Sequence, residues 1–133
     1  MKIGVLALQG DFAVHIAAMP GAMEIRTAPE IEAVDLLVIP GGESTTLLHL
    51  LKDSGIEEAT RSLLDRGGVV FGTCAGAILL AKKVTNPSQP SWNLIDIDLE
   101  RNAYGRQIDS FEAVLDQPYK GVFIRAPRIR RVG

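Results

Sequence analysis

The stretch VVFGTCAGAILL, residues 69–80, decides the fold of this 133-residue chain. An apolar, β-branched run leads through Gly72-x-Cys74-x-Gly76 into a helical pattern, which is the cysteine form of the nucleophile elbow. In such a turn the nucleophile has a strained backbone, and the flanking residues pass so close to one another that side chains there would collide. The stretch therefore predicts a buried strand, a tight turn and a helix, with Cys74 at the turn.

Cys74 is the only cysteine, so the chain can form neither an intramolecular disulfide nor a cysteine-rich zinc site. On this turn it is a candidate catalytic nucleophile, and the backbone N–H of Ala75, at the start of the next helix, can be offered to an oxyanion. The alternative is that Cys74 is a small buried hydrophobe, the commonest role of a free cysteine.

The elements on either side of the turn alternate between strands and helices. Strands buried on both faces are predicted at residues 3–8, 36–39 and 69–71, and helices at residues 12–19, 46–52, 56–66 and 75–83. This βαβα order predicts an α/β fold with a three-layer, mostly parallel open sheet and helices on both of its faces, as in flavodoxin-like proteins.

The pattern changes after a Pro- and Ser-containing loop at residues 87–90. Strands are predicted at residues 94–99, 110–115 and 121–124 with no helices between them, which favours antiparallel additions to the sheet in the C-terminal half. A single domain over residues 1–133 is expected, because the length and the 47% hydrophobic content suit one core.

A second glycine-rich turn is expected at the same sheet edge as Cys74. The strand at residues 36–39 ends in Pro40-Gly41-Gly42, whose backbone amides can approach a ligand closely, and Ser44 or Thr45 can cap the next helix. Ligands bind at the carboxyl edge of an open parallel sheet. The alternative is an ordinary turn with a helix cap, in which Glu43 only complements the helix dipole.

Two arginines further along the chain are fit to bind a carboxylate. Arg101 lies in the polar stretch 100–107, and Arg125 ends the predicted strand at residues 121–124. A solvated loop is the alternative for the polar stretch.

Charge and hydropathy exclude several classes of partner. The net charge of −2 gives no broad attraction for nucleic acid, and the local basic patch of Arg125, Arg128, Arg130 and Arg131 is better explained as a solvated or partner-facing surface. No apolar run is long enough to span a membrane. A cytoplasmic protein that binds neither nucleic acid nor membrane is expected.

Taken together, the segments resemble the glutaminase subunits of pyridoxal 5'-phosphate synthase, which are class I, triad-type glutamine amidotransferases. The resemblance is collinear from Lys2 to about Arg128. Its most specific segments are Leu6-Ala7-Leu8-Gln9-Gly10, Pro40-Gly41-Gly42-Glu43-Ser44-Thr45, Gly72-Thr73-Cys74-Ala75-Gly76, Glu100-Arg101-Asn102, Gly105-Arg106-Gln107, Asp109-Ser110-Phe111-Glu112 and Phe123-Ile124-Arg125-Ala126-Pro127.

The resemblance implies a function and a site. Cys74 would attack the side-chain amide of L-glutamine and form a thioester, and hydrolysis would then yield glutamate and ammonia. Gly42 and Ala75 would supply the oxyanion hole, and Gln9 would lie near the site and the synthase interface. The residues implied to bind glutamine are Gly42, Glu43, Ser44, Arg101, Ile124 and Arg125.

The resemblance also implies a partner. Ammonia would pass to a barrel-shaped pyridoxal 5'-phosphate synthase subunit within a large ring-shaped hetero-oligomer, in vitamin B6 biosynthesis. No metal and no organic cofactor are expected, because a thiol nucleophile and backbone amides suffice for the chemistry.

The family takes its catalytic base from a C-terminal His-Pro-Glu segment, and the sequence reaches Gly133 without one. His15 and His49 fall in helical patterns and are expected to be ordinary helix residues. A chain without this segment is therefore expected to turn over glutamine poorly. Two alternatives stay open, namely a noncatalytic partner-binding subunit of the same complex and a redox sensor that uses Cys74.

Overall fold

A computed structural model describes residues 1–101, 111–114, 120–123 and 127–133. The chain forms two compact units, Met1–Leu80 and Ala81–Gly133, and each is described by itself. Whether the chain acts as the single domain expected from its length stays a prediction.

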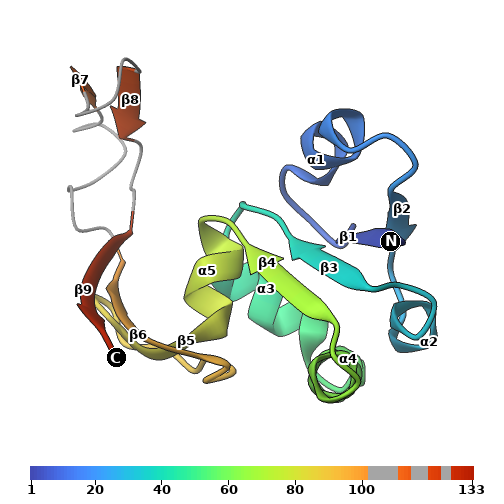
Figure 1. The fold of residues 1–133 in the computed structure, drawn as a ribbon. Coiled ribbons are helices and arrows are strands. Elements are labelled where there is room, and N and C mark those ends of the chain that lie inside the picture. Colours follow the sequence, from blue (N-terminus) through green and yellow to red (C-terminus); the bar gives the residue numbers. More distant parts are fainter. Residues whose placement is uncertain (102–110, 115–119, 124–126) are drawn as a thin grey trace. The chain divides into compact units, whose positions relative to one another are not determined.

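The first unit is a parallel sheet with helical connections, as predicted (Figure 1). The order of its strands is β2-β1-β3-β4, and all neighbouring pairs are parallel. Its elements are β1 (Ile3–Leu6), α1 (Phe12–Ala18), β2 (Met23–Ile25), α2 (Ala28–Ile31), β3 (Leu36–Ile39), α3 (Ser44–Leu51), α4 (Ile56–Asp65), β4 (Val69–Gly72) and α5 (Ala75–Leu80).

The strand order explains why helices cover both faces of this sheet. The chain moves in one direction from β1 to β2 and in the other from β2 through β3 to β4. Because βαβ crossovers are right-handed, this reversal places α1 on one face and α3 and α4 on the opposite face (Figure 1). The fully buried core includes Val5, Leu37, Val38, Ile39 and Leu63.

Three sequence predictions for this unit were wrong or incomplete. The short elements β2 and α2 were not predicted, although Thr27 and Glu30 form a capping box at the start of α2. The helix predicted to reach residue 83 ends at Leu80, because β5 begins at once. Val69 and Phe71 are each 52% exposed, since β4 is an edge strand of the sheet and is not buried on both faces.

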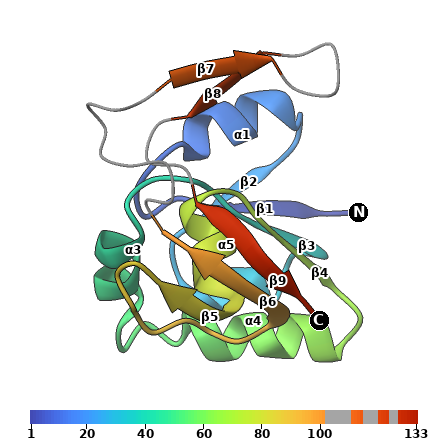
Figure 2. The same cartoon turned by 90° about the vertical axis from the view of Figure 1, so that its left-hand side faces the viewer.

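The second unit is formed by strands (Figure 2). β5 (Ala81–Thr85) pairs in parallel with β6 (Ile95–Glu100), and β6 pairs antiparallel with β9 (Arg128–Val132). β7 (Phe111–Val114) and β8 (Lys120–Phe123) form a separate antiparallel ribbon. Antiparallel pairing is therefore confirmed, and within the described ranges these strands pair with one another in two sheets.

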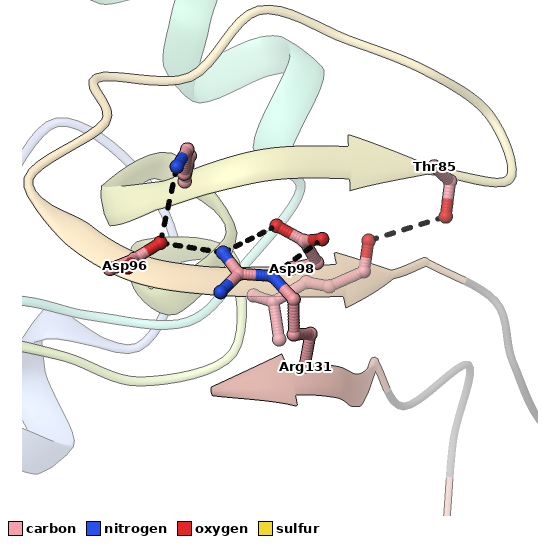
Figure 3. Close-up of polar contacts among 6 residues, drawn as sticks. Thr85, Asp96, Asp98 and Arg131 are labelled. Atoms are coloured by element: carbon pink, nitrogen blue, oxygen red, sulfur yellow. Dashed lines mark hydrogen bonds and ion pairs between the residues drawn. The ribbon is translucent and has the colours of Figure 1, made fainter. Parts of the chain in front are cut away.

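Arg131 is paired with carboxylates of the neighbouring strand (Figure 3). Its Nη2 is 2.5 Å from Asp96 Oδ1, and its Nε is 3.1 Å from Asp98 Oδ2. The hydrogen bond from Arg131 lowers the pKa of Asp96, and this effect outweighs the opposing effect of desolvation. Arg130 likewise pairs with Glu100, so the charges of Arg130 and Arg131 are neutralised locally.

Among the described residues, no helix combines the length and the apolar character that crossing a bilayer requires.

Candidate functional site

The candidate site lies at the carboxyl ends of three neighbouring parallel strands (Figure 1). Gln9 follows β1, the Pro40-Gly41-Gly42 turn follows β3, and Cys74 follows β4. Open parallel sheets bind ligands at this edge. The prediction that the two glycine-rich turns share one edge is confirmed.

Cys74 occupies a strained turn between β4 and α5. Its φ of 47° lies in the left-handed region, which non-glycine residues rarely adopt, and the residue is exposed. Cys74 is thus not a buried hydrophobe. The turn is held by hydrogen bonds from the N–H of Ile78 to the Cys74 carbonyl, 3.0 Å, and from the N–H of Gly76 to the Thr73 carbonyl, 2.8 Å.

The two glycines of the elbow are required by close backbone contacts. An added β-carbon on Gly72 would lie 2.7 Å from the carbonyl carbon of Gly76. One on Gly76 would lie 2.0 Å from the carbonyl oxygen of Ile39 in the neighbouring strand. The glycines therefore let α5 begin directly against β3 and β4, which fixes where the cysteine emerges.

The Pro40-Gly41-Gly42 turn lies beside the nucleophile. A β-carbon on Gly41 would lie 3.2 Å from Cβ of Cys74 and 3.5 Å from Oδ2 of Asp11. Gly42 has a φ of 149° and is exposed. Ala75 is the first residue of α5, so its N–H has no acceptor within the helix. The two backbone groups expected to form an oxyanion hole thus belong to the turn after β3 and to the first residue of α5.

Gln9 packs against Gly42. Its Oε1 accepts a hydrogen bond of 3.1 Å from the N–H of Glu43, whereas its Nε2 is buried and has no partner among the described residues. A β-carbon on Gly42 would clash with this side-chain amide. The structure therefore places Gln9 against the Gly42 turn and leaves its Nε2 without a partner among the described residues.

Glu43, and neither Ser44 nor Thr45, is the N-cap of α3. Its carboxylate accepts hydrogen bonds from the N–H groups of Thr45, 3.1 Å, and Thr46, 2.6 Å. Partial burial opposes ionisation, but the hydrogen bonds from Thr45 and Thr46 outweigh it and lower the pKa of Glu43 to about 2. The prediction of a Ser44 or Thr45 cap was wrong, because the helix begins at Ser44 and buries that residue.

The remaining predicted glutamine-binding residues lie elsewhere in the chain. Arg101 belongs to the second unit, where its N–H donates to the Thr85 carbonyl, 2.8 Å, and its guanidinium donates to Gln89. Ile124 and Arg125 lie outside the described residues.

One histidine contacts the nucleophile turn, and no pattern in the sequence predicts this contact. Nε2 of His15, on α1, is 3.3 Å from the hydroxyl of Thr73, the residue before Cys74. His49 is exposed on α3. The described part of the chain contains no group of three or more His, Cys, Asp or Glu side chains that could hold a metal ion.

Comparisons with known proteins agree with this geometry. Residues 5–133 match the SNO glutamine amidotransferase family. The pyridoxal 5'-phosphate synthase subunit PdxT of Thermotoga maritima is 44% identical over 143 residues, which cover 100% of this chain and 76% of that protein. The subunit of the same name from Mycolicibacterium paratuberculosis is 49% identical over 146 residues, covering 99% of this chain and 84% of that protein.

A solved structure supports the fold as well. A crystal structure of a glutamine amidotransferase, 45% identical in sequence, superposes with a TM-score of 0.86 and covers 100% of this chain and 76% of that one. The predicted α/β architecture of the class I amidotransferases is thereby confirmed.

Proposed function

This chain belongs to the SNO glutamine amidotransferase family, and from that premise we propose that it is the glutaminase subunit of a pyridoxal 5'-phosphate synthase. The observation that carries the proposal is the position of Cys74 on a left-handed turn beside Gly41, at the carboxyl edge of the sheet. The redox-sensor alternative has no comparable support from the relatives.

The proposed reaction uses Cys74 as its nucleophile. The sulfur attacks the side-chain amide carbon of L-glutamine, and the N–H groups of Gly42 and Ala75 stabilise the negative charge that develops on the oxygen. The carbon–nitrogen bond then breaks, and the nitrogen leaves as ammonia after taking up the proton that the Cys74 thiol gave up. Water hydrolyses the γ-glutamyl thioester, releases glutamate and restores the thiol.

Glu43 is suited to hold the substrate's α-ammonium group. Because the pKa of Glu43 is about 2, its carboxylate is negative at neutral pH, and the cap bonds fix it beside Gly42. On the family resemblance, Arg101 and Arg125 are proposed to pair with the α-carboxylate, and Ser44 and Ile124 to take part in binding glutamine.

The proton acceptor for Cys74 is not assigned to either histidine of this chain. The hydrogen-bond partner of His15 is Thr73, and His49 is exposed on a different helix. We propose instead that ammonia production depends on a His-Glu pair like that of the family. It also depends on the barrel-shaped synthase subunit, with which the chain is proposed to form a cytoplasmic hetero-oligomer.

The test uses the single cysteine. An electrophilic glutamine analogue should add to the protein once, at Cys74, with free L-glutamine slowing the reaction, and Cys74→Ser should abolish labelling. Ammonia release from glutamine should also be measured with the synthase subunit present. Labelling that glutamine does not slow would contradict a glutamine site.

A further inference from the structure

The contact between His15 and Thr73 joins two parts of the chain that are 58 residues apart. His15 lies on α1, after the first strand, and Thr73 directly precedes Cys74. Either tautomer of the imidazole keeps the contact, because the hydroxyl can donate to Nε2 or accept from it. Both side chains are partly buried, so the bond is shielded in part from water.

Thr73 is held from three directions. Its N–H donates to the carbonyl of Ile39, 3.1 Å, and its own carbonyl accepts from the N–H of Gly76, 2.8 Å. The hydroxyl bond to His15 is the third restraint and the only one of these made by a side chain. Since Cys74 follows with a strained φ of 47°, the orientation of its side chain depends on how firmly Thr73 is held.

Helix α1 buries little of its surface in the described part of the chain. None of its residues is buried, and its first turn is tied to the site through the N–H of Asp11, which donates to the Gly41 carbonyl, 3.1 Å. The His15 contact therefore fastens a largely exposed helix to the nucleophile turn.

We propose that His15 is a positioning residue for Cys74, acting through the Thr73 hydroxyl to hold the nucleophile turn in its reactive geometry. The proposal rests on the proposed role of Cys74 as nucleophile. His15 is not a catalytic residue here, because it contacts Thr73 and not the sulfur.

The experiment measures the rate at which iodoacetamide alkylates Cys74 in the folded protein, followed by intact mass, together with the thermal unfolding midpoint. Loss of one hydrogen bond should slow alkylation about threefold to tenfold in His15→Leu and in Thr73→Val. The double variant should be no slower than either single variant, because both remove the same bond. His15→Gln and Thr73→Ser keep a polar partner and should restore most of the rate.

His49→Leu is the matched control, since His49 is the other histidine of the chain and is exposed. It should leave the alkylation rate unchanged. Alkylation of His15→Leu at the wild-type rate, or additive losses in the double variant, would overturn the proposal. The proposal would also be overturned if the loss of alkylation rate only paralleled a fall in the unfolding midpoint and was not reversed by His15→Gln.

This assay separates the proposal from the proposed function. Iodoacetamide needs only the cysteine, whereas the glutamine analogue also needs the substrate pocket. If the analogue fails to label while His15→Leu still slows iodoacetamide, the glutaminase function fails and the positioning role stands.

Discussion

Gly42 and Gln9 are packed so closely that an added β-carbon on Gly42 would lie 2.3 Å from Oε1 of Gln9. The same oxygen accepts the N–H of Glu43, so the Gln9 amide supports the turn that is proposed to bind the oxyanion. Gly42 also has a φ of 149°, which L-residues with side chains rarely adopt.

Gly42→Ala is therefore expected to displace either Gln9 or the turn and to lower kcat for glutamine hydrolysis about 100-fold, the usual effect of losing one oxyanion donor. Hydrolysis is measured as ammonia release with the synthase subunit present. Gly21→Ala is the control, because that glycine also has a positive φ but has open space around it. Wild-type kcat in Gly42→Ala would show that this backbone group does not stabilise the transition state.

Gly76→Ala should destabilise the first unit. The new methyl group would lie 2.0 Å from the carbonyl oxygen and 2.8 Å from the carbonyl carbon of Ile39, and this strand backbone leaves little room for relaxation. A loss of about 3 kcal/mol in the free energy of unfolding is expected from this overpacking, measured by urea titration. Gly21→Ala should cost only about 1 kcal/mol, from its left-handed backbone. Equal losses in the two variants would argue against a steric contact at Gly76.

Glu43 should make stability depend on pH. Because its pKa is lowered in the folded protein, its contribution is complete above pH 4.5 and is lost as the pH falls towards about 2. Glu43→Ala should cost about 1 kcal/mol at pH 7, the usual value of an N-cap, and the difference from wild type should shrink in acid. Urea titrations between pH 7 and pH 3 would test this. Glu32→Ala, which removes an exposed carboxylate outside the site, is the control substitution.

Arg131 should make a small and salt-dependent contribution to the stability of the folded protein. It bridges Asp96 and Asp98, but all three side chains are at least a quarter exposed, so solvent and ions screen the pair. Arg131→Ala is expected to lower the unfolding midpoint slightly in low salt and not at all in about 1 M salt. Arg128→Ala on the same strand is the comparison. If the unfolding midpoint of Arg131→Ala stayed lowered in high salt, Arg131 would stabilise the protein through packing and not through its charge.

Much of the site could be predicted because its signals are local. Gly72, Cys74 and Gly76 are close in sequence, and the sterics of a strand-to-helix turn determine which residue types can occupy them. The strand at residues 36–39 was predicted at its observed bounds, since a fully buried run followed by Pro-Gly-Gly leaves few alternatives. The short elements β2 and α2 were missed because three or four residues show no reliable periodicity.

The amino-acid sequence by itself thus determined the elbow, its glycines and the parallel α/β class, all of which follow from sterics and periodicity over a few neighbouring residues. Tertiary structure alone decided which strands are neighbours, that β4 is an edge, that Gln9 lies against Gly42 and that His15 reaches Thr73. Those contacts join residues that are distant in the sequence, and they arise only when crossover handedness and burial of the apolar strands bring the carboxyl ends together.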